Sequence, residues 1–258
     1  MAYALITGAS KGIGKALAKE LAAKGYDLLL VARSAGLLSE LKSKLKKETG
    51  REVHTLDLDL SEPQADLKVF EWCEKNHFSI SVLVNNAGYG LWGNFEELSL
   101  EEQNNMMQLN MLFLVNLTYR LIPRLKKEKS SFILNVGSTA AYQSVPTLSL
   151  YAATKAFVVN FSRGLRHELK KSSISVTCLS PGGTKTGFVE RSRMHHMEKT
   201  AEKLSMTPEA VAKVAIAGLF KKKAEIIPGF INKFSVGIIN FIPKSWIEKT
   251  AHNLYRKK

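Results

Sequence analysis

The residues best suited to chemistry are Tyr151 and Lys155, in the stretch YAATK. They lie four positions apart on a predicted helix, so the two side chains share one helix face. A free tyrosine has a pKa of about 10, and a neighbouring ammonium favours the phenolate and lowers that pKa toward neutral pH. The pair can therefore serve as a general acid and base, although the same spacing is also common on helices that only face solvent.

Further polar residues follow predicted strands or lie within helices. Asn85 and Asn86 open the stretch NNAG at 85–88, Asn110 lies within a predicted helix, and Ser138 follows the strand FILNV. We expect Asn85 and Asn86 to support the end of a strand rather than to react.

Three glycines, Gly8, Gly12 and Gly14, occur in TGASKGIG, between a predicted strand at 3–7 and a helix that begins at about Gly12. Without a Cβ, the backbone of such a turn can approach a pyrophosphate, and the N-terminus of the helix offers unpaired N–H groups and a partial positive charge. A Walker phosphate loop is excluded, because Ala9 and Ala16 stand where that motif needs glycine and Ser or Thr.

The elements that must position these residues alternate along the chain. Apolar runs predict strands near 3–7, 27–32, 53–57, 81–85, 132–137, 174–179 and 224–227, and longer patterns predict helices near 12–24, 34–49, 63–76, 101–127, 150–171 and 207–220. This alternation predicts an α/β fold with a doubly wound parallel sheet and helices on both faces. A chain of 258 residues, 45% of them hydrophobic, suits one such domain.

Taken together, the motifs resemble those of the short-chain dehydrogenase/reductases. They are TG-x-x-x-G-x-G, NNAG, a serine thirteen residues before Y-x-x-x-K, and PGGTKT at 181–186, and the resemblance covers roughly residues 3–229. It implies a Rossmann fold and hydride transfer between a nicotinamide cofactor and a carbonyl or alcohol substrate. Tyr151 would protonate the carbonyl oxygen and Ser138 would hydrogen-bond it. Lys155 would lower the tyrosine pKa and hold the ribose, and Asn110 would anchor a water that relays protons to Lys155.

The resemblance also implies which residues contact the cofactor. Thr186 would contact the nicotinamide carboxamide, and Asp59 would lie by the adenine, with Asp57 as an alternative in the repeat DLDL. The full implied set is Gly8, Ser10, Lys11, Gly12, Ile13, Gly14, Arg33, Asp59, Leu60, Asn86, Ala87, Gly88, Tyr151, Lys155, Pro181, Gly182, Thr184 and Thr186.

The end of the second strand bears on cofactor choice. An NAD enzyme usually carries an acid there to bind the ribose 2′-hydroxyl, whereas this chain has Ala32 followed by Arg33. Lys11 is a second cation within reach, and a 2′-phosphate is bound by such partners. NADP(H) is therefore the expected cofactor.

The cysteine content and the absence of targeting signals bear on location. Cys73 and Cys178 lie far apart, with no C-x-x-C and no histidine cluster near either, so we expect neither a disulfide framework nor a metal site. Cys178 is expected in the core. The sequence has no signal-peptide pattern and no uncharged apolar stretch of spanning length. We expect a cytoplasmic protein.

The net charge of +14 favours anionic partners. No basic helix or aromatic-interleaved groove motif accompanies it, so nucleic acid is not an expected partner.

The loop 187–206 contains three methionines and suits an adaptable lid over a hydrophobic or acyl substrate. We expect its His195 and His196 to be an exposed pair. The alternative to an enzyme is a catalytically silent nucleotide-binding or membrane-surface scaffold of the same fold.

The end of the chain departs from the usual family pattern. We divide the chain into a catalytic domain at 1–229 and a basic amphipathic extension at 230–258, packed on the same domain. Phe230, Phe234, Ile238 and Phe241 recur at helical spacing, and a basic segment with Trp246 follows Pro243. We expect this apolar stripe to leave water by covering the substrate cleft or a neighbouring subunit, or through peripheral contact with a membrane.

The long helices at 101–127 and 150–171 are expected to pair chains into a homodimer or homotetramer.

Overall fold

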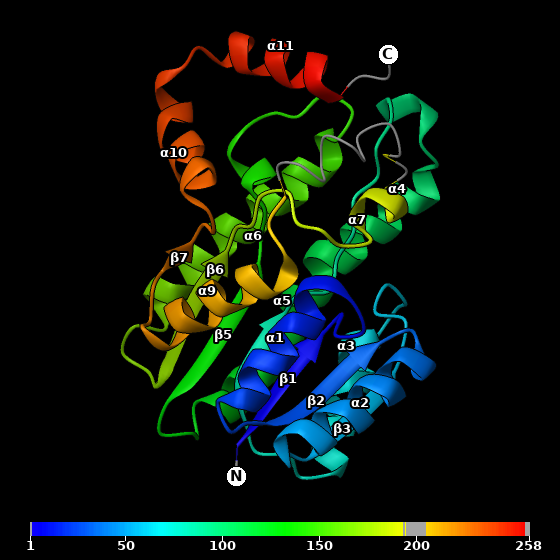
Figure 1. The fold of residues 1–258 in the computed structure, drawn as a ribbon, viewed down its shortest axis with the longest axis vertical. Coiled ribbons are helices and arrows are strands. Elements are labelled where there is room, and N and C mark those ends of the chain that lie inside the picture. Colours follow the sequence, from blue (N-terminus) through cyan, green and yellow to red (C-terminus); the bar gives the residue numbers. More distant parts are fainter. Residues whose placement is uncertain (1, 193, 195–204, 256–258) are drawn as a thin grey trace.

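The computed structural model describes residues 2–192, 194 and 205–255 (Figure 1). Within these residues, seven parallel strands form one sheet in the order β3-β2-β1-β4-β5-β6-β7. The strands are β1 (Tyr3–Thr7), β2 (Asp27–Ala32), β3 (Val53–Asp57), β4 (Ile80–Asn85), β5 (Ser131–Val136), β6 (Ile174–Leu179) and β7 (Glu225–Ile226). The order reverses between β1 and β4, and ligands of open parallel sheets bind at the carboxyl ends of strands at such a reversal.

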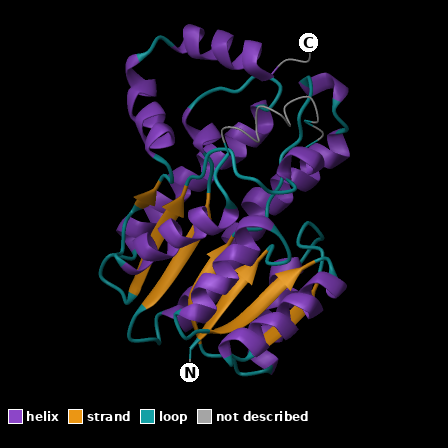
Figure 2. Cartoon of the chain, viewed as in Figure 1, coloured by secondary structure: helices purple, strands orange, loops and turns teal. Residues whose placement is uncertain are grey.

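Helices cover both faces of the sheet (Figure 2). The α-helices are α1 (Gly12–Ala23), α2 (Ala35–Thr49), α3 (Ala65–Lys75), α4 (Leu100–Met107), α5 (Leu114–Leu125), α6 (Ser149–Glu168), α7 (Phe188–Arg191), α9 (Pro208–Phe220), α10 (Phe230–Ile238) and α11 (Lys244–Tyr255). Short 3₁₀ turns occur at η1 (Phe95–Glu97), η3 (Thr139–Tyr142) and η5 (Ile239–Phe241). The predicted α/β doubly wound fold is confirmed.

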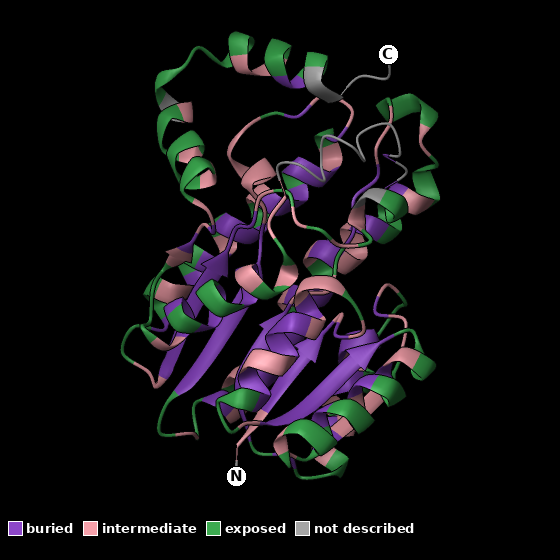
Figure 3. Ribbon diagram, viewed as in Figure 1, coloured by how far each residue is buried: buried purple, intermediate pink, exposed green. Residues whose placement is uncertain are grey.

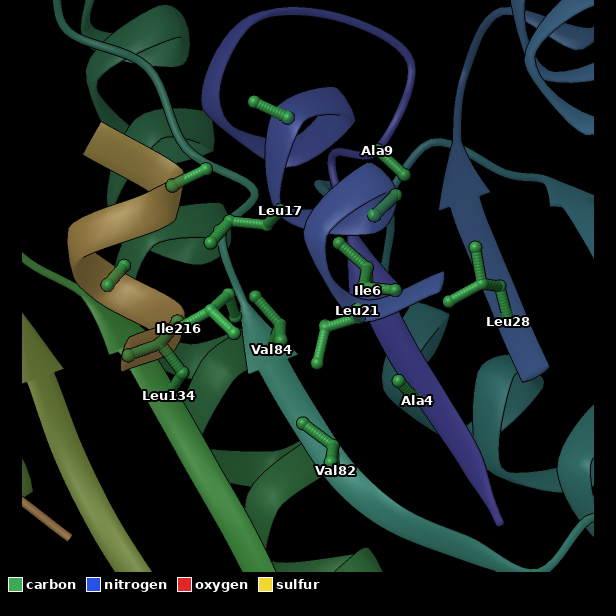
Figure 4. Close-up of a cluster of buried hydrophobic side chains, with 14 of the residues drawn as sticks. Ala4, Ile6, Ala9, Leu17, Leu21, Leu28, Val82, Val84, Leu134 and Ile216 are labelled. Atoms are coloured by element: carbon green, nitrogen blue, oxygen red, sulfur yellow. The ribbon is translucent and has the colours of Figure 1, made fainter. Parts of the chain in front are cut away.

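The strands are buried on both faces because each sends alternate side chains into two different cores. Ala4 and Ile6 of β1 join the core beneath α1, α2 and α9, and Figure 4 shows this cluster. Leu5 points the other way, into the core beneath α3, α5 and α6. Figure 3 shows the resulting buried sheet between partly exposed helices. Cys178 is fully buried, as expected.

One predicted helix differs from the structure. The segment expected as a single helix at 101–127 consists of α4, a π-helical turn η2 (Gln108–Phe113) and α5. A π turn widens the helix by about one residue and is frequent at functional sites. Here it contains Asn110, whose side chain is buried. Apolar spacing cannot reveal such a local widening, because the residues on both sides of it remain helical.

The apolar stripe of the C-terminal extension is exposed in this chain. Helices α10 and α11 rise beyond the carboxyl ends of the strands and bend over (Figure 1). No residue of α10 is buried, and Phe230, Phe234 and Phe241 are exposed. Within the described residues, the chain's own domain thus leaves this stripe exposed, and cover by a neighbouring subunit or by a membrane stays a prediction. Among the described helices, none is both long and apolar enough to cross a bilayer.

Candidate active site

The turn that contains Gly8, Gly12 and Gly14 lies between β1 and α1 and packs against Asn86 at the end of β4. Gly8 and Gly12 have φ angles of +66° and +53°, in the left-handed region that favours glycine. A Cβ at Gly8 would lie 2.8 Å from Nδ2 of Asn86, and a Cβ at Gly14 would overlap the carbonyl oxygen of Gly8. Two of the three glycines are thus required by packing within the protein, in addition to any closeness to a pyrophosphate.

Gly12 lies where the turn meets the loop after β6. A Cβ there would lie 2.9 Å from Cγ2 of Thr186. The structure thus places the first turn of α1 beside the PGGTKT segment, which follows it by more than 150 positions. The N-cap residue Lys11 makes no side-chain capping bond, and the first turn of α1 holds no acidic residue. This helix end therefore retains N–H groups and a partial positive charge that suit an anion.

Asn86 ties the turn to β4. Its Nδ2 donates to the carbonyl oxygens of Thr7 and Gly8, at 2.9 and 3.1 Å. Asn85 lies beneath and donates to Oγ1 of Thr118 and to Oδ1 of Asn135, both at 2.9 Å. Both asparagines therefore support strand ends, as the sequence predicted.

Asn110 is 1% exposed and clamps the loop after NNAG onto α6. Its Nδ2 donates to the carbonyl oxygen of Tyr89 at 2.9 Å and to Oγ1 of Thr154 at 3.0 Å, and its Oδ1 accepts from Tyr89 N at 3.2 Å. Both amide protons are thus engaged within the protein. The role in a proton relay stays a prediction.

Lys155 is buried beside Tyr151. Its side chain is held at the end of β5, where Nζ donates to the carbonyl oxygen of Val136 at 2.9 Å. Nζ lies 5.8 Å from the centroid of the Tyr151 ring. Burial lowers the pKa of Lys155 to about 8, because a low-dielectric environment disfavours the charged amine. Gly88 makes room for this amine, since a Cβ there would lie 3.3 Å from Nζ.

Tyr151 itself is almost fully buried. Its ring packs against the ring of Phe188 in α7, with centroids 5.3 Å apart, and a Cβ at Gly90 would lie 3.1 Å from its Cδ2. The helix spacing thus brings the phenol and the amine together, as predicted, and α7 covers the phenol ring.

Ser138 lies shortly after β5 and is the N-cap residue of η3. Its Oγ accepts a hydrogen bond from Ala140 N at 3.1 Å. This bond occupies a lone pair of the oxygen, so the hydroxyl proton can still be donated to another group. A serine in this state can hydrogen-bond a carbonyl oxygen, which is the role that the family resemblance implies.

Arg33 and Asp59 meet at the ends of β2 and β3. Nη1 of Arg33 lies 3.3 Å from Oδ2 of Asp59, and the other carboxylate oxygen accepts from the backbone and hydroxyl of Ser61. Burial raises the pKa of Asp59, but the Ser61 hydrogen bonds and the charge of Arg33 together hold that pKa below its usual value. Asp57 ends β3 opposite Ala32 and is exposed.

The remaining expected contacts divide into surface and core residues. Leu60 is buried in the core, so only its main chain remains to contact a ligand. Oγ1 of Thr184 donates to the carbonyl oxygen of Gly182, and Oγ1 of Thr186 accepts from Phe188 N. Pro181 is buried and Lys11 is exposed, while Ser10, Ile13 and Ala87 are half-buried near the switch point. His195 and His196 lie outside the described residues.

Two residues at the site were not anticipated from the sequence. Arg191 of α7 lies over the ring of Tyr89, with its guanidinium carbon 4.5 Å from the ring centroid. Burial lowers the pKa of Arg191, and the positive charge of Arg33 adds to this effect. The two residues in contact are about a hundred positions apart, and neither belongs to a recognisable motif, so no local signal could have paired them.

Comparison with known proteins agrees with these features. A family model described as short chain dehydrogenase matches residues 2–197. An uncharacterized oxidoreductase from Schizosaccharomyces pombe is 33% identical over 70% of this chain, and the match spans only 60% of that protein. A very-long-chain 3-oxoacyl-CoA reductase from Mus musculus is 28% identical, and the match covers 99% of this chain and 82% of that one.

Solved structures show the same fold. A short-chain dehydrogenase from Sphingobium yanoikuyae in complex with NADPH has a TM-score of 0.82 at 30% identity and covers 94% of this chain and 96% of its own. A short-chain dehydrogenase/reductase from Burkholderia phymatum in complex with NAD has a TM-score of 0.85 at 21% identity, with 93% and 94% covered. The two neighbours hold different nicotinamide cofactors, so the fold alone does not decide between them.

Proposed function

The chain belongs to the short-chain dehydrogenase family, and we propose that it is an NADP(H)-dependent oxidoreductase that interconverts a carbonyl and a secondary alcohol. The observation that carries this proposal is the buried Lys155 amine beside the Tyr151 phenol. A binding module has no need of an acid/base pair with a lowered amine pKa, whereas a carbonyl reductase does.

A nicotinamide dinucleotide fits the residues at the switch point. Gly8 and Gly12 hold backbone conformations that keep side chains out of the turn, and the N-terminus of α1 is uncapped. These groups would hold the pyrophosphate, Lys155 would hold the ribose, and Arg33 would face the adenosine end. When bound, the cofactor supplies the hydride that the protein side chains cannot provide.

The protein's own groups manage the substrate oxygen. Reduction of the carbonyl requires a proton on that oxygen, and the Tyr151 hydroxyl would donate it. The hydroxyl of Ser138 holds the oxygen in place. The ammonium form of Lys155 stabilises the phenolate left on Tyr151, which takes up a proton from solvent to complete the cycle.

We propose a hydrophobic or acyl-chain substrate. The apolar side chains around Tyr151 support this, because Phe188, Leu148, Val145 and Met194 belong to its cluster. The similarity to a very-long-chain 3-oxoacyl-CoA reductase points the same way.

The proposed homodimer or homotetramer is supported by exposed apolar side chains along α5 and α6, among them Tyr119 and Phe157.

The proposed function is tested by following NADPH oxidation against a panel of ketones, aldehydes and 3-oxoacyl thioesters of increasing chain length. We expect turnover that rises with chain length. NADPH binding without turnover of any member of the panel would contradict the proposal and favour a silent nucleotide-binding scaffold.

We propose NADP(H) over NAD(H) because Ala32 stands where an acid would bind the ribose 2′-hydroxyl, and the cation Arg33 follows it. Arg33→Ala is expected to weaken NADPH binding by roughly tenfold to a hundredfold, since a charge-assisted bond to phosphate contributes about 1.5–3 kcal/mol. Binding of NADH should change much less. Fluorescence titrations with both cofactors measure the difference.

Arg163→Ala is the matched control, because Arg163 also pairs with a carboxylate at 3.3 Å, that of Glu225, but at the far edge of the sheet. It should alter neither affinity. Equal losses of NADPH and NADH affinity in Arg33→Ala would show that this residue does not recognise the 2′-phosphate.

A further inference from the structure

The C-terminal arm, defined as residues 230–255, concentrates exposed apolar side chains. Phe230, Ile231, Phe234, Phe241 and Trp246 are 84%, 75%, 61%, 86% and 70% exposed. With Ile238 and Ile242, the arm holds seven of the 13 large hydrophobic side chains found exposed among the described residues. Single exposed apolar residues are ordinary, but a concentration of this kind marks an interaction surface.

Part of the arm is turned away from solvent: Val236, Ile239 and Ile247 are half-buried. In α10, Asn232 contacts the domain: a Cβ on Gly182 would lie 2.5 Å from its Oδ1, and its Nδ2 donates to the carbonyl oxygen of Pro228 at 2.8 Å. In α11, Ala251 is buried. The seven exposed apolar side chains belong to the rest of the arm, most of which Figure 3 colours as exposed. The seven apolar side chains therefore remain exposed although the arm contacts the domain through Asn232.

The charge of the arm selects the kind of partner. Lys233, Lys244 and Lys249 are exposed, and Glu248 is the single acidic residue of the arm. The sequence continues with Arg-Lys-Lys, and the whole chain carries a net charge of +14. Apolar and aromatic side chains next to lysines are typical of helices that lie in the interface of an anionic bilayer. A second copy of the arm would bring like charges together, which disfavours pairing of two arms.

We propose that the arm docks the protein on the surface of a bilayer rich in anionic lipids, with its aromatic side chains inserted among the headgroups. The arm lies beyond the carboxyl ends of the strands, the end that carries Ser138 and α7 (Figure 1). Docking therefore turns the catalytic end of the sheet toward the lipid. Docking itself does not depend on the proposed oxidoreductase activity, and the two are measured separately.

The test uses the full-length protein and sedimentation with phosphatidylcholine vesicles, with and without roughly one third phosphatidylglycerol. We expect binding to the anionic vesicles at about 50 mM NaCl, at least fivefold weaker binding at about 500 mM NaCl, and little binding to pure phosphatidylcholine. Lys244→Glu with Lys249→Glu should weaken binding at least tenfold. The matched control, Lys46→Glu with Lys47→Glu, makes the same charge change in the last turn of α2, at the opposite end of the sheet, and should retain most of the binding.

The apolar contribution is tested by Phe241→Ser with Trp246→Ser, which should also weaken binding at least tenfold. Val214→Ser, at an exposed apolar position of α9, should leave binding unchanged. Circular dichroism and NADPH titration show that each variant is folded, and NADPH oxidation is followed in the same samples. Lost vesicle binding with retained oxidation supports docking by the arm without touching the proposed function.

Two results would overturn the proposal. One is the absence of binding to anionic vesicles at low salt. The other is an arm variant that binds vesicles as the wild type does while its light-scattering mass falls from a multiple of one chain to a single chain, which would assign the arm to a second copy.

Discussion

Tyr151→Phe is expected to reduce the turnover of carbonyl reduction by roughly a hundredfold or more, in line with the usual contribution of a positioned general acid. The substitution keeps the ring, which packs against Phe188, and removes only the hydroxyl, which we propose as the proton donor. NADPH affinity should therefore stay within about twofold of the wild type, since no charge-assisted bond is lost. Steady-state kinetics and fluorescence titration measure the two effects independently.

The matched control is Tyr119→Phe, which removes a hydroxyl from a tyrosine that is exposed on α5. It should change neither turnover nor affinity. A Tyr151→Phe enzyme that keeps more than a tenth of the wild-type rate would remove Tyr151 from the role of acid.

Lys155→Met is expected to lose both turnover and cofactor affinity. The variant keeps an apolar side chain of similar length but has no amine to hold a ribose or to stabilise a phenolate. The expected loss of turnover is again roughly a hundredfold or more, and NADPH binding should weaken as well. That second effect distinguishes Lys155 from Tyr151, whose substitution spares binding.

The same substitution should stabilise the fold at pH 7. Burial lowers the pKa of Lys155 in the folded protein to about 8, whereas an unfolded lysine has a pKa of about 10.4. Below pH 8 the folded chain carries the full destabilisation of a buried ammonium. Removing it should raise the free energy of unfolding by about 1–3 kcal/mol, after allowing for the lost hydrogen bond to Val136.

The stability gained by Lys155→Met should change with pH in a definite direction. Between about pH 8 and pH 10.4 the unfolded wild type binds more protons at this position than the folded form, so this position makes the wild type more stable as pH rises. The advantage of Lys155→Met should therefore shrink through that window. Urea unfolding at several pH values measures it, with the exposed Lys47→Met as control. A variant less stable than the wild type at pH 7 would contradict the expected charge burial.

Much of the fold and part of the site could be read from the sequence. The strands are short apolar runs because a parallel sheet covered on both faces buries its central strands, and every residue of β2, β4, β5 and β6 is buried. The glycine turn, NNAG and Ser138 each follow one of these runs, and parallel strands bring their carboxyl ends to one edge. Tyr151 and Lys155 share a helix face by spacing alone. For these residues, local pattern and chain order were sufficient.

Other parts of the site depended on contacts between residues far apart in the chain. The π turn around Asn110 has no signature in apolar spacing, and its clamp on Tyr89 and Thr154 exists only once α6 packs beside it. Arg191 meets Tyr89 because α7 lies over the loop after β4. The lowered pKa of Lys155 likewise comes from burial, which no single segment produces.

The C-terminal arm shows most clearly which features follow from the local sequence and which depend on tertiary packing. Apolar residues at helical spacing and Pro243 predicted two helical segments, and α10 and α11 form there. The same spacing predicted that the stripe would be covered by the cleft, a neighbouring subunit or a membrane, and within the described residues of this chain it is exposed. Periodicity determines which side chains share a face of a helix, because that follows from the helix geometry. Which face meets the protein depends on the surface it packs against, and here that surface accepts Asn232 and leaves the aromatic side chains outside.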